Sequence, residues 1–381
     1  MKVLLAHNRY RVPGGEERHV ELLEQGLTEA GVTVRRFERS SSGLSPAARA
    51  AAGLALTYRP GGGGIGAAID EWRPDVVHFH NLWPLLTPAA LRIARRREAA
   101  VVLTVHNYRF ACPGGTLTRD GTVHESCLEG SSLACALRNP RGSLLESLVY
   151  GLALEVQRRL RMLERWVDAF VAPSEFVRQA MVRAGLPGDR ISVVHHGVSI
   201  GPERGTDEAG RRGLLYTGRL SPEKGVEVLL EAARRAPDVP VVVAGAGPLL
   251  AQLQSVSPPS VTYAGWLDQA ALGALRDRSL MTLQPSVCFE TSSFAAIESA
   301  AAGRGVIASR IGGLTEIVRD GVSGVLVEPG DPEALARAMR AACADPAGAA
   351  EIGASARRLA RDEFELARQT QRLVDVYEAA A

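Results

Sequence analysis

Short apolar runs alternate with segments of helical periodicity at the start of the chain. The run from Val3 to Ala6 predicts a buried strand, and the helix expected after Gly14-Gly15 carries apolar residues at positions i, i+3 and i+7. Gly31 ends that helix, and Val32 to Phe37 returns as a strand. A strand, a glycine-rich loop, a helix and a second strand are the opening of an α/β fold.

The same alternation continues along the chain in two series. Further strands of the first series are predicted at 74–80, 101–105, 170–172 and 191–194. After Gly213 a second series follows, with predicted strands at 214–216, 241–243, 280–283, 306–308 and 325–327. Short apolar strands that alternate with helices form doubly wound parallel sheets. Because 381 residues exceed what one hydrophobic core usually serves, we expect two α/β domains that meet near Gly197.

Two stretches break the alternation. Residues 40–66 are rich in serine, alanine and glycine, and they predict a mobile surface segment. Residues 107–140 are polar, lack clear periodicity and hold three of the five cysteines. A long irregular insertion in a compact domain is usually functional or tied by a metal. We therefore expect a first domain over residues 1–196, with this insertion inside it, and a second domain over residues 197–363.

Composition narrows the classes of function. The 44 basic residues nearly balance the 42 acidic ones and aromatic residues make up 5%, so neither charge nor base stacking indicates a nucleic-acid partner. The apolar run at the N-terminus is too short for a signal peptide, and no stretch reaches the ~18 apolar residues of a membrane-spanning helix. Five cysteines, an odd number, argue against a disulfide-stapled secreted protein. The expected location is the cytoplasm.

The loop from Gly218 to Gly225 places two cations between a predicted strand and a predicted helix. Ser221 is expected to cap that helix, with Pro222 in its first turn. Arg219 and Lys224 would then project from the carboxyl edge of the sheet, where doubly wound folds bind ligands. Two cations in this place suit a pyrophosphate group, although an exposed basic loop would have the same sequence.

Two glutamates lie eight residues apart around the start of another predicted helix. Glu290 precedes the helix and Glu298 lies inside it. The helix N-terminus offers unpaired N–H groups to an anion, and a carboxylate is a good acceptor for the vicinal hydroxyls of ribose. Two solvated glutamates are the alternative. The turn at Gly312-Gly313 adds paired glycines, which allow a ligand to approach the backbone or serve only the turn itself.

In their order and spacing, these motifs resemble a family 4 glycosyltransferase of GT-B fold, in which two Rossmann-like, doubly wound parallel-sheet domains face a central cleft. The resemblance covers nearly the whole chain and is strongest from Gly213 to Asp331. It is carried by Gly14-Gly15, His106, Gly218-Arg219, Lys224-Gly225, Gly245-Ala246-Gly247-Pro248, Glu290, Glu298, Gly312-Gly313, Glu316 and Gly321 to Gly324.

The resemblance implies the ligands of these residues. In the family, the residues that match Arg219 and Lys224 hold the donor diphosphate, and the one that matches Glu298 binds the ribose. The donor sugar contacts the residue matching Glu290 and the backbone after it. The expected catalytic residues are His106, Arg219, Lys224 and Glu290, and the further donor-binding residues are Gly14, Gly15, Trp266, Thr291, Ser292, Ser293 and Glu298.

Single positions carry more specific expectations from the family. His106 would lie near the reacting face of the sugar, the loop at Gly14-Gly15 would close over the diphosphate or the acceptor, and the backbone beside Trp266 would read the base. The chain departs from the family where Thr291-Ser292 replace the usual Phe-Gly and where Gly305 replaces a common proline. The first departure puts in doubt how the donor sugar is held. A terminal helix at 364–381 is expected to pack back onto the first domain.

The expected reaction is retaining transfer of a hexose-type sugar from a UDP- or GDP-linked donor to a hydroxyl. The acceptor could be a polysaccharide intermediate, a lipid-linked sugar or a small natural product. Same-face substitution requires stabilisation of the leaving diphosphate, which Arg219 and Lys224 would supply. Because no Asp-x-Asp motif occurs in the chain, we expect no catalytic metal and no cofactor requirement.

Other functional interpretations of the same pattern of strands and helices remain open. A nicotinamide-dependent dehydrogenase fits the alternation, but Leu250 stands where the third glycine of its fingerprint belongs. A nucleotide-sugar epimerase would turn over the donor without an acceptor. A non-catalytic nucleotide-sugar-binding protein would not need the cations and both glutamates that this chain retains.

The insertion contains a candidate metal site. Cys112, His124, Cys127 and Cys135 fall within 24 residues, and His124-x-x-Cys127 has a common spacing of metal ligands. Three thiolates and one imidazole would make a closed tetrahedral zinc site of structural type, and some relatives carry similar cysteines. Reduced thiols in a loop are the alternative.

The basic run from Gln157 to Arg165 is amphipathic. Such a run could touch anionic lipid, as in relatives that use lipid-linked acceptors. More often it is a solvated helix face, so peripheral membrane contact is not the favoured expectation.

Overall fold

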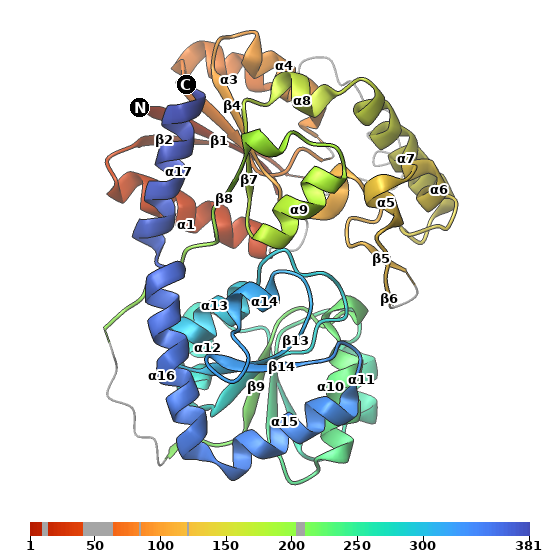
Figure 1. Cartoon of the computed structure of the whole chain (residues 1–381), viewed down its shortest axis with the longest axis vertical. Coiled ribbons are helices and arrows are strands. Elements are labelled where there is room, and N and C mark those ends of the chain that lie inside the picture. Colours follow the sequence, from red (N-terminus) through yellow and green to blue (C-terminus); the bar gives the residue numbers. More distant parts are fainter. Residues whose placement is uncertain (10–13, 41–63, 84, 120–121, 203–209) are drawn as a thin grey trace. The chain divides into compact units, whose positions relative to one another are not determined.

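The computed structural model describes residues 1–9, 14–40, 64–83, 85–119, 122–202 and 210–381 (Figure 1). Most of the expected mobile segment at 40–66 lies outside the described residues. The chain divides into two compact units. Unit 1 contains Met1–Arg119, His124–Gly197 and Leu366–Ala381, and unit 2 contains Val198–Glu365 together with Asp120–Val123.

Unit 1 is built on a six-stranded parallel sheet of order β2-β1-β3-β4-β7-β8. After β1 the chain adds β2 on one side and then continues with β3 on the other, so the topological switch lies between β1 and β3. Doubly wound folds bind ligands at the carboxyl edge beside this switch. The strands are β1 (Lys2–Arg9), β2 (Thr33–Ser40), β3 (Val76–Phe79), β4 (Ala100–Thr104), β7 (Ala169–Ala172) and β8 (Ile191–Val193).

Apolar side chains are buried on both faces of the first sheet, as near-continuous hydrophobic strands require. One face packs against α1 (Gly15–Glu29) and the terminal helix α17 (Leu366–Ala380), which contact each other. Tyr377 fixes α17 to the sheet, because its hydroxyl lies 2.6 Å from Nδ1 of the buried His78. The other helices of this part are α3 (Ile65–Trp72), α4 (Thr87–Arg95), α8 (Met162–Trp166) and α9 (Glu175–Arg183).

In the insertion at 107–140, the described residues form short elements, and one long helix follows. They are η2 (Tyr108–Phe110), β5 (Thr118–Arg119), β6 (Thr122–Val123), α5 (Ser126–Glu129) and α6 (Ser132–Ala136), followed by α7 (Leu144–Arg159). Near the end of the unit a short 3₁₀ turn, η3 (Gly188–Arg190), leads into β8. The expectation of irregular structure at 107–140 agrees with these bounds.

Unit 2 is built on a second six-stranded parallel sheet, of order β11-β10-β9-β12-β13-β14. Its switch point lies between β9 and β12. The strands are β9 (Leu214–Thr217), β10 (Val241–Ala244), β11 (Val261–Gly265), β12 (Met281–Gln284), β13 (Gly305–Ser309) and β14 (Gly324–Val327). Together with the first sheet, this confirms the prediction of two doubly wound α/β domains.

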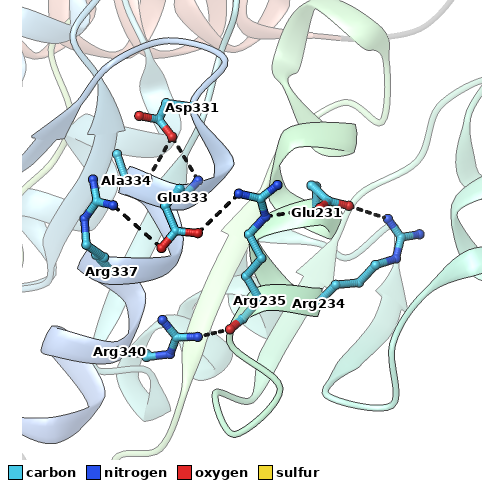
Figure 2. Close-up of polar contacts among 8 residues, drawn as sticks. All are labelled: Glu231, Arg234, Arg235, Asp331, Glu333, Ala334, Arg337 and Arg340. Atoms are coloured by element: carbon cyan, nitrogen blue, oxygen red, sulfur yellow. Dashed lines mark hydrogen bonds and ion pairs between the residues drawn. The ribbon is translucent and has the colours of Figure 1, made fainter.

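Helices cover both faces of the second sheet. One core includes α10 (Val226–Arg235), α11 (Leu250–Val256) and α15 (Pro332–Ala344), and the other includes α13 (Phe294–Ala301), α14 (Leu314–Ile317) and α16 (Pro346–Glu363). A further helix, α12 (Gln269–Arg278), precedes β12. On the surface, Arg235 of α10 pairs with Glu231 and also reaches Glu333 of α15, at 3.1 and 3.2 Å (Figure 2).

Candidate functional site

The loops that follow β9 and β12 touch each other at the switch point of unit 2. The first loop ends in a 3₁₀ turn, η5 (Pro222–Lys224), and in Gly225, whose φ is +67°. A Cβ atom at Gly225 would lie 1.8 Å from the carbonyl oxygen of Pro285, so no other residue fits without a shift of the backbone. This glycine therefore brings Lys224 against the loop that carries Glu290.

Ser221 does not cap a helix, contrary to the expectation from its sequence. Its hydroxyl donates to Oε1 of Glu223 at 2.6 Å, and it accepts no backbone hydrogen bond as a cap. The physical reason is Gly225, because its left-handed conformation separates the 3₁₀ turn from α10, which begins only at Val226.

Lys224 and Glu290 form the central ion pair of this edge. The Nζ atom of Lys224 lies 2.7 and 2.9 Å from the two carboxylate oxygens of Glu290, and the hydroxyl of Ser286 donates to Oε1 of Glu290 at 2.5 Å. Burial alone would lower the pKa of Lys224, but the Glu290 carboxylate outweighs it and raises that pKa. Lys224 is therefore a fixed cation at any physiological pH. Burial also raises the pKa of the Cys288 thiol to about 12.

Arg219 is the second expected cation, and its side chain is exposed. Its backbone is held from both sides, since the Tyr216 hydroxyl donates to the Arg219 carbonyl at 2.9 Å and Leu220 N donates to Ala246 O at 2.9 Å. In the part of the chain that the structure describes, the guanidinium of Arg219 makes no ion pair. Its charge is therefore available to a ligand, whereas the charge of Lys224 is balanced by Glu290.

The helix α13 begins where the sequence predicts, and Ser293 caps it by accepting from Ala296 N at 3.3 Å. Thr291 and Ser292 form the loop just before this cap. Glu298 lies inside the helix, and its Oε2 accepts from Nη2 of Arg276 in α12 at 3.0 Å. The side chains of both residues are mostly buried, at 14% and 9% exposure. The structure therefore gives Glu298 a partner that the sequence did not indicate.

The paired glycines at 312–313 lie against the backbone that carries Glu290. Gly313 N donates to Glu290 O at 2.7 Å. Cβ atoms at Gly312 and Gly313 would lie 2.6 Å from the carbonyl oxygens of Glu290 and Thr291 respectively. These glycines therefore pack closely against the backbone of the loop at Glu290 and Thr291. This agrees with the interpretation that they serve the turn itself.

Trp266 follows β11, the edge strand of the second sheet. Its side chain is 76% exposed, and Gly265 before it has a φ of +71°. In strand order β11 stands two strands away from β9 at the switch point. The role of Trp266 beside a base stays a prediction.

At the carboxyl edge of unit 1, His106 belongs to a cluster of imidazoles. Its Nε2 lies 3.1 Å from Nδ1 of His80, and neighbouring ring centroids across the cluster lie 4.1 to 6.5 Å apart. Six of the eight histidines of the chain take part: His7, His19, His78, His80, His106 and His196. Burial lowers the pKa of His80 and of His106 well below the usual range, and that of His19 to about 3. His19, His80 and His106 are therefore neutral.

Sequence reasoning selected only His106 from this cluster. The signal that could have found the others is their position, because His7, His80 and His196 stand at or just after the ends of strands β1, β3 and β8. Carboxyl ends of parallel strands meet at one edge of a sheet. His19 comes instead from α1 and could not be placed from strand positions.

A cavity of unit 1 opens beside the imidazole cluster. Its lining includes His80, Trp83, His106, Asn107, Arg109 and Gln157. Neutral imidazoles, an amide and a guanidinium are hydrogen-bonding groups that can contact a polar, uncharged molecule.

The glycines at the start of α1 are tied to this edge. Gly14 N donates to Oε2 of the buried Glu17 at 2.8 Å, and Oε1 of Glu17 lies 3.6 Å from Nε2 of His7. Next to it, Oε1 of Glu16 accepts from Nδ2 of Asn107 at 2.8 Å. Burial raises the pKa of Glu16. Gly14 and Gly15 therefore border the imidazole cluster, while residues 10–13 lie outside the described residues.

Of the four candidate zinc ligands, the structure brings together Cys112, Cys127 and Cys135. His124 lies outside this group, where its Nε2 contacts the Ser126 hydroxyl at 2.7 Å and Nη1 of Arg138 at 3.1 Å.

The basic run at 157–165 is not one continuous helix. The helix α7 ends at Arg159, Arg161 has a φ of +49°, and α8 begins at Met162. Arg158 turns inward, since its Nη1 donates to Gly130 O at 2.7 Å. Among the described residues, no helix combines the length and the apolar character that crossing a bilayer would take. Contact with a membrane stays a prediction that nothing in the geometry tests.

Two family models together match most of the chain. Residues 13–201 match the model described as Glycosyltransferase Family 4, and residues 211–345 match the model described as Glycosyl transferases group 1.

Among similar proteins, glycogen synthase of Mycobacterium tuberculosis (strain CDC 1551 / Oshkosh) is 27% identical over 100% of this chain and 95% of that protein. D-inositol 3-phosphate glycosyltransferase of Geodermatophilus obscurus is 30% identical over 97% of this chain and 85% of its own length. The crystal structure of HepE from Anabaena in complex with UDP-glucose matches with a TM-score of 0.69 and 17% identity, over 100% of both chains. At that identity, the last similarity shows the fold alone.

Proposed function

The chain belongs to the family 4 glycosyltransferases, and from this premise we propose that it moves a hexose-type sugar from a nucleoside diphosphate donor to a hydroxyl acceptor, with retention of anomeric configuration and without a catalytic metal. The observation that carries the proposal is the ion pair of Lys224 with Glu290, on the switch point of unit 2, beside the exposed cation Arg219. Fixed cations at this edge suit an anionic leaving group.

The proposed chemistry uses the two cations differently. The bond between the anomeric carbon and the diphosphate oxygen breaks, its electron pair leaves with the diphosphate, and the acceptor oxygen bonds to the same carbon while its proton passes to the diphosphate. Negative charge therefore grows on the leaving group. Lys224, fixed by Glu290 and Ser286, would meet that charge at a set position, and Arg219 would add a charge that no described residue balances.

The family supports the remaining donor contacts. We propose that Glu298 accepts from the ribose hydroxyls while Arg276 orients its carboxylate, and that the backbone at Thr291 to Ser293 holds the donor sugar. Three further roles rest on the family alone. They place His106 near the reacting face of the sugar, Gly14-Gly15 near the diphosphate or the acceptor, and Trp266 near the base.

The similar proteins indicate which substrates to test first, and the cysteines indicate a compartment. HepE was solved with UDP-glucose, which favours a UDP-linked hexose over a GDP-linked one as the first donor to test. The names glycogen synthase and D-inositol 3-phosphate glycosyltransferase refer to polyhydroxylated molecules, so we propose a polyhydroxylated acceptor for this chain. We propose the cytoplasm as the compartment, because none of the five cysteines forms a disulfide.

The test is the variant Lys224→Ala, assayed with UDP-glucose and a panel of hydroxyl acceptors. Removal of one preorganised contact to developing charge should lower kcat by about 10²- to 10³-fold. Arg234→Ala is the matched control, because Arg234 lies on α10 of the same unit and its contacts, to Glu231 and to the Val256 carbonyl, are exposed. Near-normal turnover of Lys224→Ala would remove the proposed role.

The anomeric configuration of the product, read by NMR, tests retention, and an inverted product would contradict it. Turnover in the presence of a strong chelator tests metal independence. Conversion of the donor sugar without any acceptor would instead favour the epimerase alternative.

A further inference from the structure

Away from the two sheet edges, one cluster of side chains has a composition that the proposed transfer does not use. The sulfur atoms of Cys112, Cys127 and Cys135 all lie within 4.8 Å of one another, and all three side chains are buried. None of them forms a disulfide. They come from three separate turns of the insertion, after η2, in α5 and in α6. Three sulfurs that converge from separate turns are the arrangement in which a thiophilic ion is bound.

The backbone around Cys112 is organised to hold a thiolate. The amides of Gly115 and Leu117 donate to its sulfur. The turn that aims them needs Gly115, whose φ is +80° and where a Cβ atom would lie 2.8 Å from Arg109. Cys112 N in turn donates to Tyr108 O at 2.8 Å. Amide donors to sulfur stabilise negative charge on it, which a metal-bound thiolate carries.

The insertion has little regular structure to stabilise it otherwise. Its helices α5 and α6 are four and five residues long, and β5 and β6 have two residues each. Side chains hold it through contacts such as Arg158 Nη1 to Gly130 O at 2.7 Å and the Ser132 hydroxyl to Ala111 O at 3.1 Å. Arg183 of α9 adds ion pairs to Glu125 and Glu129, at 3.0 and 2.8 Å. Small loop-rich segments of this kind are usually stabilised by a disulfide or a metal, and a disulfide is absent here.

His124 is placed to complete the ligand set. It is partly exposed and stands three residues before Cys127, at the entrance of α5. Its ring contacts the side chains of Ser126 and Arg138, at 2.7 and 3.1 Å. Arg138 also lies close enough to Cys135 to act on its charge. A zinc ion with three thiolates carries a net charge of −1, which this guanidinium would offset.

We propose that Cys112, Cys127 and Cys135 bind one zinc ion as thiolates, and that His124 turns from Ser126 and Arg138 to become the fourth ligand. The donor set of three sulfurs and one imidazole favours zinc over hard cations such as magnesium or calcium. Each thiol releases its proton to solvent on binding, and no electron is transferred. Four protein ligands leave no open position, so the ion is structural. This inference does not depend on the proposed transfer reaction.

The first experiment measures metal in the full-length chain, purified without a metal-binding tag, by elemental mass spectrometry. We expect about one zinc per chain, and less than about a tenth of an equivalent would overturn the proposal. Cys127→Ser should lose the zinc, while the control Cys343→Ser, on α15 of unit 2, should keep it. Peptide mapping without reduction that found a disulfide among the three cysteines of the metal-free chain would also overturn it.

A second measurement uses the wild-type chain, in case Cys127→Ser does not fold. Titration with an organomercurial in the presence of a zinc-sensitive dye should release zinc in step with modification of three thiols. Zinc that leaves before any thiol reacts would contradict thiolate ligation. For the fourth ligand, His124→Ala should bind zinc about tenfold more weakly or worse in competition with a chelator. An unchanged affinity would remove His124 from the ligand set.

Discussion

The carboxyl edges of the two sheets are built from the same kind of strand ends, yet the titratable side chains that they carry differ in charge. In unit 1 the edge is lined by imidazoles such as His80 and His106, and burial lowers their pKa well below the usual range, so that they stay neutral. In unit 2 the edge holds Lys224, and the carboxylate of Glu290 keeps it charged despite burial.

This difference shows that burial decides the charge of a group only together with its partner. Neutral imidazoles, which donate and accept hydrogen bonds, suit an uncharged polyhydroxyl molecule, whereas a fixed cation suits a diphosphate. The same α/β architecture can therefore offer two chemically distinct surfaces, and each can be perturbed separately.

The largest expected effect is a loss of folding stability in acid, which should come from the buried histidines of unit 1 and not from Lys224 of unit 2. Burial lowers the pKa of five clustered histidines, which are His19, His78, His80, His106 and His196. In the unfolded chain these five take up protons below pH 6.5, but in the folded chain they stay neutral, down to about pH 3 for His19. Stability is therefore lost as the pH falls through 6.5, by about 2 kcal/mol at pH 5 for each such histidine. Lys224 behaves oppositely, since its raised pKa contributes stability that is lost only at strongly alkaline pH.

Denaturant unfolding between pH 7 and pH 4.5 measures this loss. His80→Gln should flatten the dependence of the unfolding free energy on pH, while His195→Gln serves as the control, because His195 is outside the cluster and its Nδ1 contacts the Pro173 carbonyl at 3.1 Å. A stability that stays constant over this range would show that the imidazoles are hydrated and protonated in the folded chain.

The next effect concerns the ion pair of unit 2. If Lys224 and Glu290 act as one unit, Lys224→Gln and Glu290→Gln should each lower kcat by about 10²- to 10³-fold, equivalent to about 3–4 kcal/mol. The double variant should then be no worse than either single one, because the second change removes a partner that is already lost. Steady-state kinetics with unchanged thermal melting would support this result, and additive losses would mean that the two residues act independently.

The sequence predicted the elements well where local signals decide them. The apolar run at 101–105 agrees with β4 (Ala100–Thr104), and the run at 241–243 agrees with β10 (Val241–Ala244). The prediction for Ser221 was wrong because the left-handed conformation of Gly225 stops the helix from starting there. Backbone conformation at one glycine is not visible in a pattern of apolar residues.

Partners of the candidate site residues were harder to predict, because they come from contacts far apart in sequence. Glu290 pairs with Lys224, 66 residues away. Arg276, which binds Glu298, lies on a different helix and has no motif of its own. The imidazole cluster likewise forms only when four strand ends and a helix meet. The lowered pKa of its buried members could therefore not be predicted from the position of any single histidine.

A smaller effect is expected from the buried hydrogen bond that anchors α17 in unit 1. Tyr377→Phe removes the hydroxyl that lies 2.6 Å from His78 Nδ1 and leaves that nitrogen buried without its partner. Unfolding in denaturant should show a loss of about 1–2 kcal/mol, mostly the cost of the unsatisfied group. Tyr263→Phe is a useful comparison, because the Tyr263 hydroxyl bonds Ser257 at a half-exposed position where water can replace it. Equal losses in the two variants would contradict the role of burial.

The smallest effect is expected from the surface pairs of unit 2. Arg235→Ala breaks contacts to Glu231 and Glu333, at positions that are 40% to 49% exposed (Figure 2). Water screens such pairs and ordering two long side chains has an entropic cost, so the free energy of unfolding should fall by less than about 0.5 kcal/mol. The loss should shrink further in high salt. If Arg235→Ala instead destabilised the chain as much as Tyr377→Phe does, α10 and α15 would depend on this bridge, and the contrast between paired groups that are buried and those that are exposed would fail.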